Sequence, residues 1–144
     1  MINLSLHRKL AILGAIPFVY CAISVLFGIN FIEKISDPIL LVNSYSLGIV
    51  CFLTGIHWAT YLYKDSSRSM NLMILSNIFF LLAWLTFLIL DEDIALISYQ
   101  FLLIFLLLID LRLFNLSIIN KDYFETRILA TSLAVLSLLV VVFS

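Results

Sequence analysis

Residues 101–109 read FLLIFLLLI, and this run decides the fold class of the chain. Every position carries a bulky apolar side chain, whereas a strand of a membrane β-barrel alternates apolar and polar residues with a period of two. A segment that lies in lipid must also satisfy its backbone hydrogen bonds internally. We therefore predict an α-helix that crosses the hydrocarbon core of a bilayer.

The composition of the whole chain agrees with this prediction. Of its 144 residues, 64% are hydrophobic and 12% are charged, and the formal net charge is -1. Soluble domains are about a quarter charged, and a globule of this size could not bury so much apolar surface. These values exclude a water-soluble domain, and the absence of excess positive charge excludes a nucleic-acid-binding protein.

Short clusters of charged residues separate apolar stretches that are each long enough to cross a bilayer, which takes about 20 helical residues. We predict five spans, at residues 10–32, 39–63, 70–90, 94–114 and 123–143. The predicted fold is therefore all-α: a single domain over residues 1–144 that forms a polytopic bundle of five transmembrane helices.

Seven of the eight Lys and Arg residues lie on one side of these spans, and only Lys34 lies on the other. The positive-inside rule, which counts Lys and Arg in short loops, then predicts a cytoplasmic N-terminus and an external C-terminus. We expect a multi-pass protein of a bacterial inner membrane, or of the mitochondrial inner membrane if the source is eukaryotic.

Polar residues inside the spans are costly in hydrocarbon, so their positions are informative. The second span carries a mostly polar stripe and, beside it, a stripe of small residues that would allow close helix approach: Ser44, Gly48, Cys51, Gly55 and Ala59. On the third span, Asn77 and Trp84 share a face that we expect to point into the bundle.

Three ionisable residues fall at one predicted depth, roughly 9 Å from the bilayer midplane on the cytoplasmic side. They are His57, Asp110 and Arg127, each on a different span. We predict one buried polar cluster, with its neighbours drawn from the same leaflet or the same stripe: His57, Trp58, Asn77, Asp110, Arg127, Gly14, Pro17 and Thr54.

Structural and functional interpretations of this cluster both stay open. Asp110 and Arg127 are most simply an ion pair that locks the last two helices together. His57 is either a core histidine that donates to Asp110 or Asn77, or a group that exchanges a proton or binds a ligand. Trp58 is more typical of the aromatic belt at a membrane interface than of a ligand contact.

No catalytic signature occurs in the sequence: we find no G-x-S-x-G, H-E-x-x-H, C-x-x-C, P-loop or G-x-G-x-x-G motif. The only candidate catalytic residues are His57 and Asp110, and an enzyme is the less favoured interpretation. Cys21 and Cys51 fall near mid-membrane and indicate packing residues, so we predict neither a metal site nor a cofactor.

Several short motifs carry a family resemblance that extends over essentially the whole chain. They are Gly14-Ala15-Ile16-Pro17-Phe18, Gly55-Ile56-His57-Trp58, Asp110, and Arg127 with Thr131. Together they resemble a bacterial membrane family of unknown function that includes the mitochondrial transmembrane protein 69 group. The resemblance implies a five-helix protein without an established activity. Ala59, where the family pattern has glycine, and the lack of a proline before the fifth span depart from it.

We expect a non-catalytic accessory or assembly component that associates with another membrane protein or with a second copy. The alternative is a membrane protein that binds a quinone-like or lipid-derived ligand, or handles protons, through His57 and Asp110. A proton path across the bilayer is disfavoured because the external half offers few polar residues beyond Gln100 and Asn43.

Overall fold

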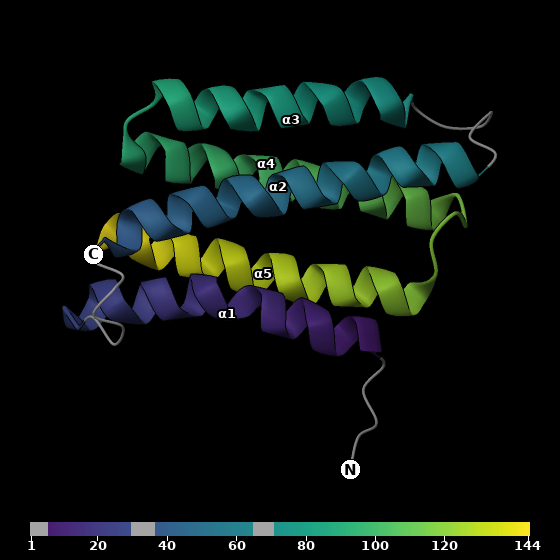
Figure 1. Ribbon diagram of the computed structural model, residues 1–144. Coiled ribbons are helices and arrows are strands. Elements are labelled where there is room, and N and C mark those ends of the chain that lie inside the picture. Colours follow the sequence, from purple (N-terminus) through teal and green to yellow (C-terminus); the bar gives the residue numbers. More distant parts are fainter. Residues whose placement is uncertain (1–5, 30–36, 65–70) are drawn as a thin grey trace, which may run out of the picture.

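The computed structural model describes residues 6–29, 37–64 and 71–144. These ranges hold five α-helices (Figure 1): α1 (Leu6–Phe27), α2 (Pro38–Tyr63), α3 (Leu72–Ile89), α4 (Glu92–Asn115) and α5 (Lys121–Phe143). All five are long and apolar enough to cross a membrane. The prediction of an all-α fold with five helices that could span a membrane is therefore confirmed, and the chain has the build of a multi-pass membrane protein.

Four of the helices form a ring, in which α1 packs against α2, α2 against α4, α4 against α5, and α5 against α1. The remaining helix, α3, packs from outside against α2 and α4, and it forms one edge of the bundle in Figure 1. The two chain ends lie at opposite ends of the bundle, as an odd number of antiparallel helices requires.

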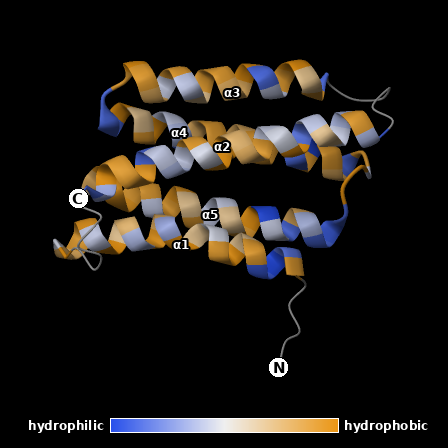
Figure 2. Ribbon diagram, in the orientation of Figure 1, coloured by the Kyte–Doolittle hydropathy of each residue, from blue (hydrophilic) through white to orange (hydrophobic). Residues whose placement is uncertain are grey.

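The most deeply packed helix is α4, which contributes ten of the buried side chains. Its fully buried Tyr99 donates a hydrogen bond from the hydroxyl to the backbone carbonyl of Ala83 on α3, at 3.1 Å. Large apolar side chains cover the outside of the bundle. Figure 2 shows how much of each helix ribbon has the orange colour of hydrophobic residues. That distribution suits contact with lipid rather than with water.

Charged residues gather at the helix ends instead. Within the described ranges, every Lys and Arg lies toward the end of the bundle where α1 begins and α2 and α4 finish: Arg8, Lys9, Lys64, Arg112, Lys121 and Arg127. The other end carries the acidic start of α4, with Glu92 and Asp93 in its first turn. The uneven distribution of Lys and Arg that the sequence indicates is therefore also present between the two ends of the folded bundle.

The ends of α1 and α3 differ from the predicted spans. We predicted that the first span would continue to residue 32, but α1 ends at Phe27 because Gly28 adopts a left-handed backbone conformation with φ 62°. Backbone hydrogen bonds from Gly28 to Val25 and from Ile29 to Ser24 close this end in a Schellman motif. Residues 30–32 and Met70, where the third span was predicted to start, lie outside the described residues.

The small stripe on α2 and the predicted inward face of α3 both point outward. On α2, Ser44, Gly48, Gly55 and Ala59 are exposed and Cys51 is partly exposed, so the small stripe makes no close approach inside the bundle. On α3, Asn77 and Trp84 are also exposed, whereas Ser76 and Ala83 face the core. Asn77 can lie outside because its amide donates to the backbone carbonyl of Met73 at 2.8 Å, one turn back in the same helix.

Candidate functional site

Three helices meet at a buried polar cluster near the basic end of the bundle. His57 lies late in α2, Asp110 lies late in α4, and Arg127 lies early in α5. All three are buried, and Asp110 is only 1% exposed. We call these three side chains the polar triad.

The turn between α4 and α5 brings Asp110 and Arg127 together. It reverses the chain through Ser117, which adopts a left-handed conformation with φ 57°, and the backbone N–H of Ile118 donates to Leu113 to close α4. Asn120 then caps α5 by accepting the N–H of Tyr123 at 2.8 Å. Because the turn is short, residues at matching distances from it face each other across the α4–α5 contact.

Asp110 contacts both of the other side chains of the triad. One carboxylate oxygen lies 2.8 Å from Nε2 of His57, and the other accepts from Nε of Arg127 at 2.7 Å. The two side chains that the sequence pairs as ions are therefore in direct contact, and His57 contacts Asp110 rather than Asn77. The carboxylate of Asp110 thus lies between the imidazole and the guanidinium.

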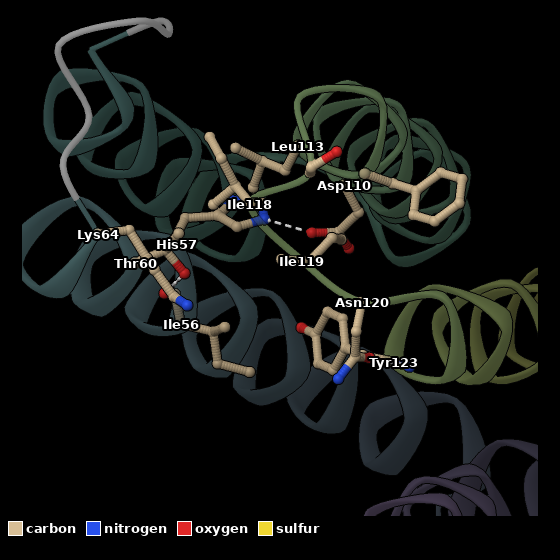
Figure 3. A pocket seen from close by; sticks show the side chains of 12 residues that line it. Ile56, His57, Thr60, Lys64, Asp110, Leu113, Ile118, Ile119, Asn120 and Tyr123 are labelled. Carbon is tan, nitrogen blue, oxygen red and sulfur yellow. Dashed lines mark hydrogen bonds and ion pairs between the residues drawn. The ribbon is translucent and has the colours of Figure 1, made fainter.

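His57 and Asp110 also line an open cavity of about 680 Å³ beside the α4–α5 turn. Figure 3 shows the imidazole and the carboxylate turned toward each other, with Tyr123 and Asn120 on the α5 side. Within the described part of the chain, Nδ1 of His57 makes no hydrogen bond. An imidazole held in this way can exchange a hydrogen bond or a proton with a molecule in the cavity.

The other predicted cluster residues lie around the triad or away from it. Thr54 is buried one turn before His57, but its hydroxyl donates to the carbonyl of Cys51 at 2.8 Å. Trp58 is 44% exposed and faces outward, as an interfacial residue would. Asn77 was predicted to join the cluster, and its exposed position on α3 shows that this prediction is wrong.

Gly14 and Pro17 belong to a second polar contact on α1. Pro17 lies inside the helix and cannot donate a backbone hydrogen bond. One turn earlier in α1, the carbonyl of Gly14 accepts the hydroxyl of Tyr45 at 2.7 Å, and Tyr45 packs edge-on against Phe18 with ring centroids 5.1 Å apart. These contacts join α1 to α2 and do not involve the triad.

Sequence reasoning missed two features of the site. Tyr123 lines the cavity beside His57, and a signal for it exists, because Tyr123 precedes Arg127 by one helical turn. His7 pairs with Asp122 at 2.9 Å between Nε2 and Oδ2 and joins the starts of α1 and α5. Among the described residues, no group of three or more His, Cys, Asp or Glu side chains could hold a metal ion.

Comparison with known proteins adds one match. A family model described as a protein of unknown function, DUF3429, matches residues 6–143. No curated protein and no solved structure matches the chain. The predicted resemblance to a family of unknown function is therefore confirmed, whereas none of these matches links the chain to the transmembrane protein 69 group.

Proposed function

We propose that this chain, which belongs to the DUF3429 family of unknown function, is a non-catalytic membrane component that assembles with a protein partner through the outward face of α2. The observation that carries the proposal is the exposed stripe of small residues on that helix: Ser44, Gly48, Cys51, Gly55 and Ala59.

The stripe lies opposite the buried face of its own helix. Gly48 precedes the buried Val50 by two residues, and Gly55 precedes the buried His57 by two, which is about 200° around the helix axis at 3.6 residues per turn. No atom of a described neighbouring element lies within 4 Å of the position that a Cβ would take at either glycine. In lipid, small residues of this spacing are typical of helix pairs that approach closely.

The polar triad supports a structural rather than a catalytic role. Both oxygens of Asp110 are engaged, by His57 and by Arg127, and the carboxylate is almost fully buried. Removing one charged side chain from such a triad leaves the opposite charge unpaired in an apolar interior, which costs free energy. The triad therefore holds α2, α4 and α5 in place behind the face that meets the partner.

A purified sample in mild detergent tests the partner face. We expect the wild-type protein to run as an assembly larger than one chain, and the double variant Gly48→Leu with Gly55→Leu to run as the single chain. Asn77→Leu, on the exposed face of α3, is the matched control and should keep the assembly. A wild type that is a single chain, or an assembly that both leucines leave intact, would contradict the proposal.

We also place the protein, as part of this proposal, in a bacterial inner membrane or, in a eukaryote, in the mitochondrial inner membrane. The basic end of the bundle supports a cytoplasmic or matrix-side N-terminus. The Gly55-Ile56-His57-Trp58 motif supports a wider relation to the transmembrane protein 69 group.

A second candidate function is supported by the open cavity at His57: binding of a quinone-like or lipid-derived molecule, or proton exchange with it. His57→Gln keeps a polar group beside Asp110 but removes the imidazole. This candidate predicts that the variant keeps its thermal stability and loses a ligand that co-purifies with the wild type across about pH 5 to 8. Unchanged ligand content together with lower stability would contradict it.

A further inference from the structure

A second cavity, lined by Arg127, lies between α1, α2 and α5. Its volume is about 280 Å³, and its walls are mostly apolar, with Gly14 and Phe18 from α1, Phe52 from α2, and Ala130 from α5. His57 and Asp110 do not line it, whereas Ile56 and Tyr123 line both this cavity and the one beside His57.

Two hydrogen-bond donors in this apolar wall have no partner. Arg127 is 8% exposed and Thr131 is 4% exposed, and both residues line the cavity. Nη2 of Arg127 and Oγ1 of Thr131 are buried without a hydrogen bond to any described residue. The two residues are one turn apart on the same face of α5. Leaving buried donors unpaired costs free energy, so an acceptor in the cavity is stabilised once a rotation of these side chains turns the donors toward it.

From these donors and walls we propose that the cavity between α1, α2 and α5 binds a neutral lipophilic molecule, whose carbonyl oxygen accepts hydrogen bonds from Arg127 and Thr131. A carbonyl oxygen has two lone pairs and can accept from both donors at once. None of the residues that line the site belongs to the small stripe on α2, and the proposal does not depend on the partner face.

The charge of the site determines that the ligand is neutral. Nε of Arg127 already donates to the carboxylate of Asp110 at 2.7 Å, so the guanidinium charge is compensated inside the bundle. An anionic headgroup would add an unpaired charge to apolar walls, which is unfavourable. A neutral carbonyl uses the free N–H of the guanidinium without adding charge.

The position and size of the cavity indicate how the ligand lies. Phe52, on its wall, is 65% exposed, and Leu10 on the α1 wall is 58% exposed, so the site borders the lipid-facing surface. About 280 Å³ is close to the lower end of the range for ligand pockets. The cavity holds the carbonyl-bearing part of the molecule, and an attached apolar chain extends into the bilayer. Lipid esters and membrane-soluble quinones both carry this chemistry.

Native mass spectrometry of the purified full chain with three probes tests the site. The probes are methyl laurate for a lipid ester, a decyl-substituted benzoquinone for a quinone, and the laurate anion. We expect saturable binding of one or both neutral probes and at least tenfold weaker binding of laurate. Stronger binding of methyl laurate would identify the ligand as a lipid ester, and stronger binding of the benzoquinone would identify it as a quinone. Binding of laurate as strong as that of the neutral probes would overturn the proposal.

Two variants link binding to the cavity. Thr131→Val keeps the shape of the side chain but removes the donor, and it should weaken binding of the preferred neutral probe about two- to tenfold. Ala130→Leu fills the cavity and should abolish that binding. Thr86→Val on α3 and Ser132→Leu, exposed on α5, are matched controls that should bind as the wild type does.

A melting curve for each variant establishes that it is folded before binding is compared. Should Ala130→Leu fail to fold, Thr131→Val decides the question alone, because it removes a single hydroxyl. No saturable binding of either neutral probe to the wild type would overturn the proposal. Equal binding by Thr131→Val and the wild type would overturn it as well.

Discussion

Asp110 is the side chain on which the interior of the bundle depends. It accepts a hydrogen bond from Arg127 and contacts His57, so a single carboxylate joins three helices. Neither partner can leave without stranding a charge or a donor in the buried part of the bundle. The same carboxylate therefore stabilises the fold and limits what chemistry His57 can perform.

Substitution of Asp110 tests this dependence. Asp110→Asn strands the Arg127 guanidinium, and we expect the free energy of unfolding to fall by about 3–5 kcal/mol. The double variant Asp110→Asn with Arg127→Gln removes both charges and should recover part of that loss. Unfolding titrations in mixed micelles measure each variant. Strictly additive losses from the two single variants would show that these side chains do not interact.

The pairing of Asp110 with Arg127 was predictable from the sequence, but the position of Asn77 was not. Opposite charges on two consecutive helices, each six residues from its predicted midpoint, have few other ways to be satisfied in lipid. An asparagine has a local alternative, because its amide can donate to the carbonyl one turn back in its own helix, as Asn77 does with Met73. A polar residue with that option does not reveal which face of its helix points inward.

Single residues decide where the elements end. Hydropathy alone carries the first span to residue 32, but α1 stops at Phe27 because Gly28 adopts a left-handed conformation that other residues avoid. Ser117 does the same at the end of α4 without being glycine, so composition gives no comparable signal there. The number of spans follows from the length of the apolar stretches, whereas the residue at which each span ends follows from the backbone conformation there.

Two glycine substitutions, one within α1 and one directly after it, test whether backbone conformation sets the end of this helix. Gly28→Ala places a Cβ at φ 62°, where the surrounding space is open, so its cost is purely conformational and should lower the free energy of unfolding by about 1–2 kcal/mol. Gly14→Ala lies inside the helix, where the added Cβ meets only the Tyr45 hydroxyl at 3.9 Å, and should raise stability by about 0.5–1 kcal/mol. Both are measured by unfolding titration. Equal effects of the two substitutions would contradict the assigned end of α1.

The whole molecule combines a buried polar triad, a basic end and an outward face of small residues on α2. Five helices and their approximate spans could be predicted because bilayer thickness sets the length of each apolar stretch. The direction in which the small stripe points could not be predicted, because small residues pack equally well against a neighbour in the same chain and against a partner. Only the packing of α2 against α4, α3 and α1 distinguishes these two uses.

Reporter fusions after Ser144 test the orientation of the bundle. The basic end, with Arg8, Lys64 and Arg112, predicts that the N-terminal side is cytoplasmic and that the C-terminus is external. An alkaline phosphatase fused there should be active, and a green fluorescent protein exported in unfolded form should stay dark. Fluorescence without phosphatase activity would reverse the assigned orientation.

The most direct test of the partner face uses a matched pair of tryptophans in intact membranes. Trp58 borders the small stripe on α2 and is 44% exposed, and Trp84 on α3 is 45% exposed. Each is replaced in turn by photoreactive benzoylphenylalanine and irradiated. We predict a protein adduct from position 58 that disappears when Gly48→Leu is added, and none from position 84. Equal adducts from the two positions, or no protein adduct from position 58, would contradict the proposal that α2 meets a partner.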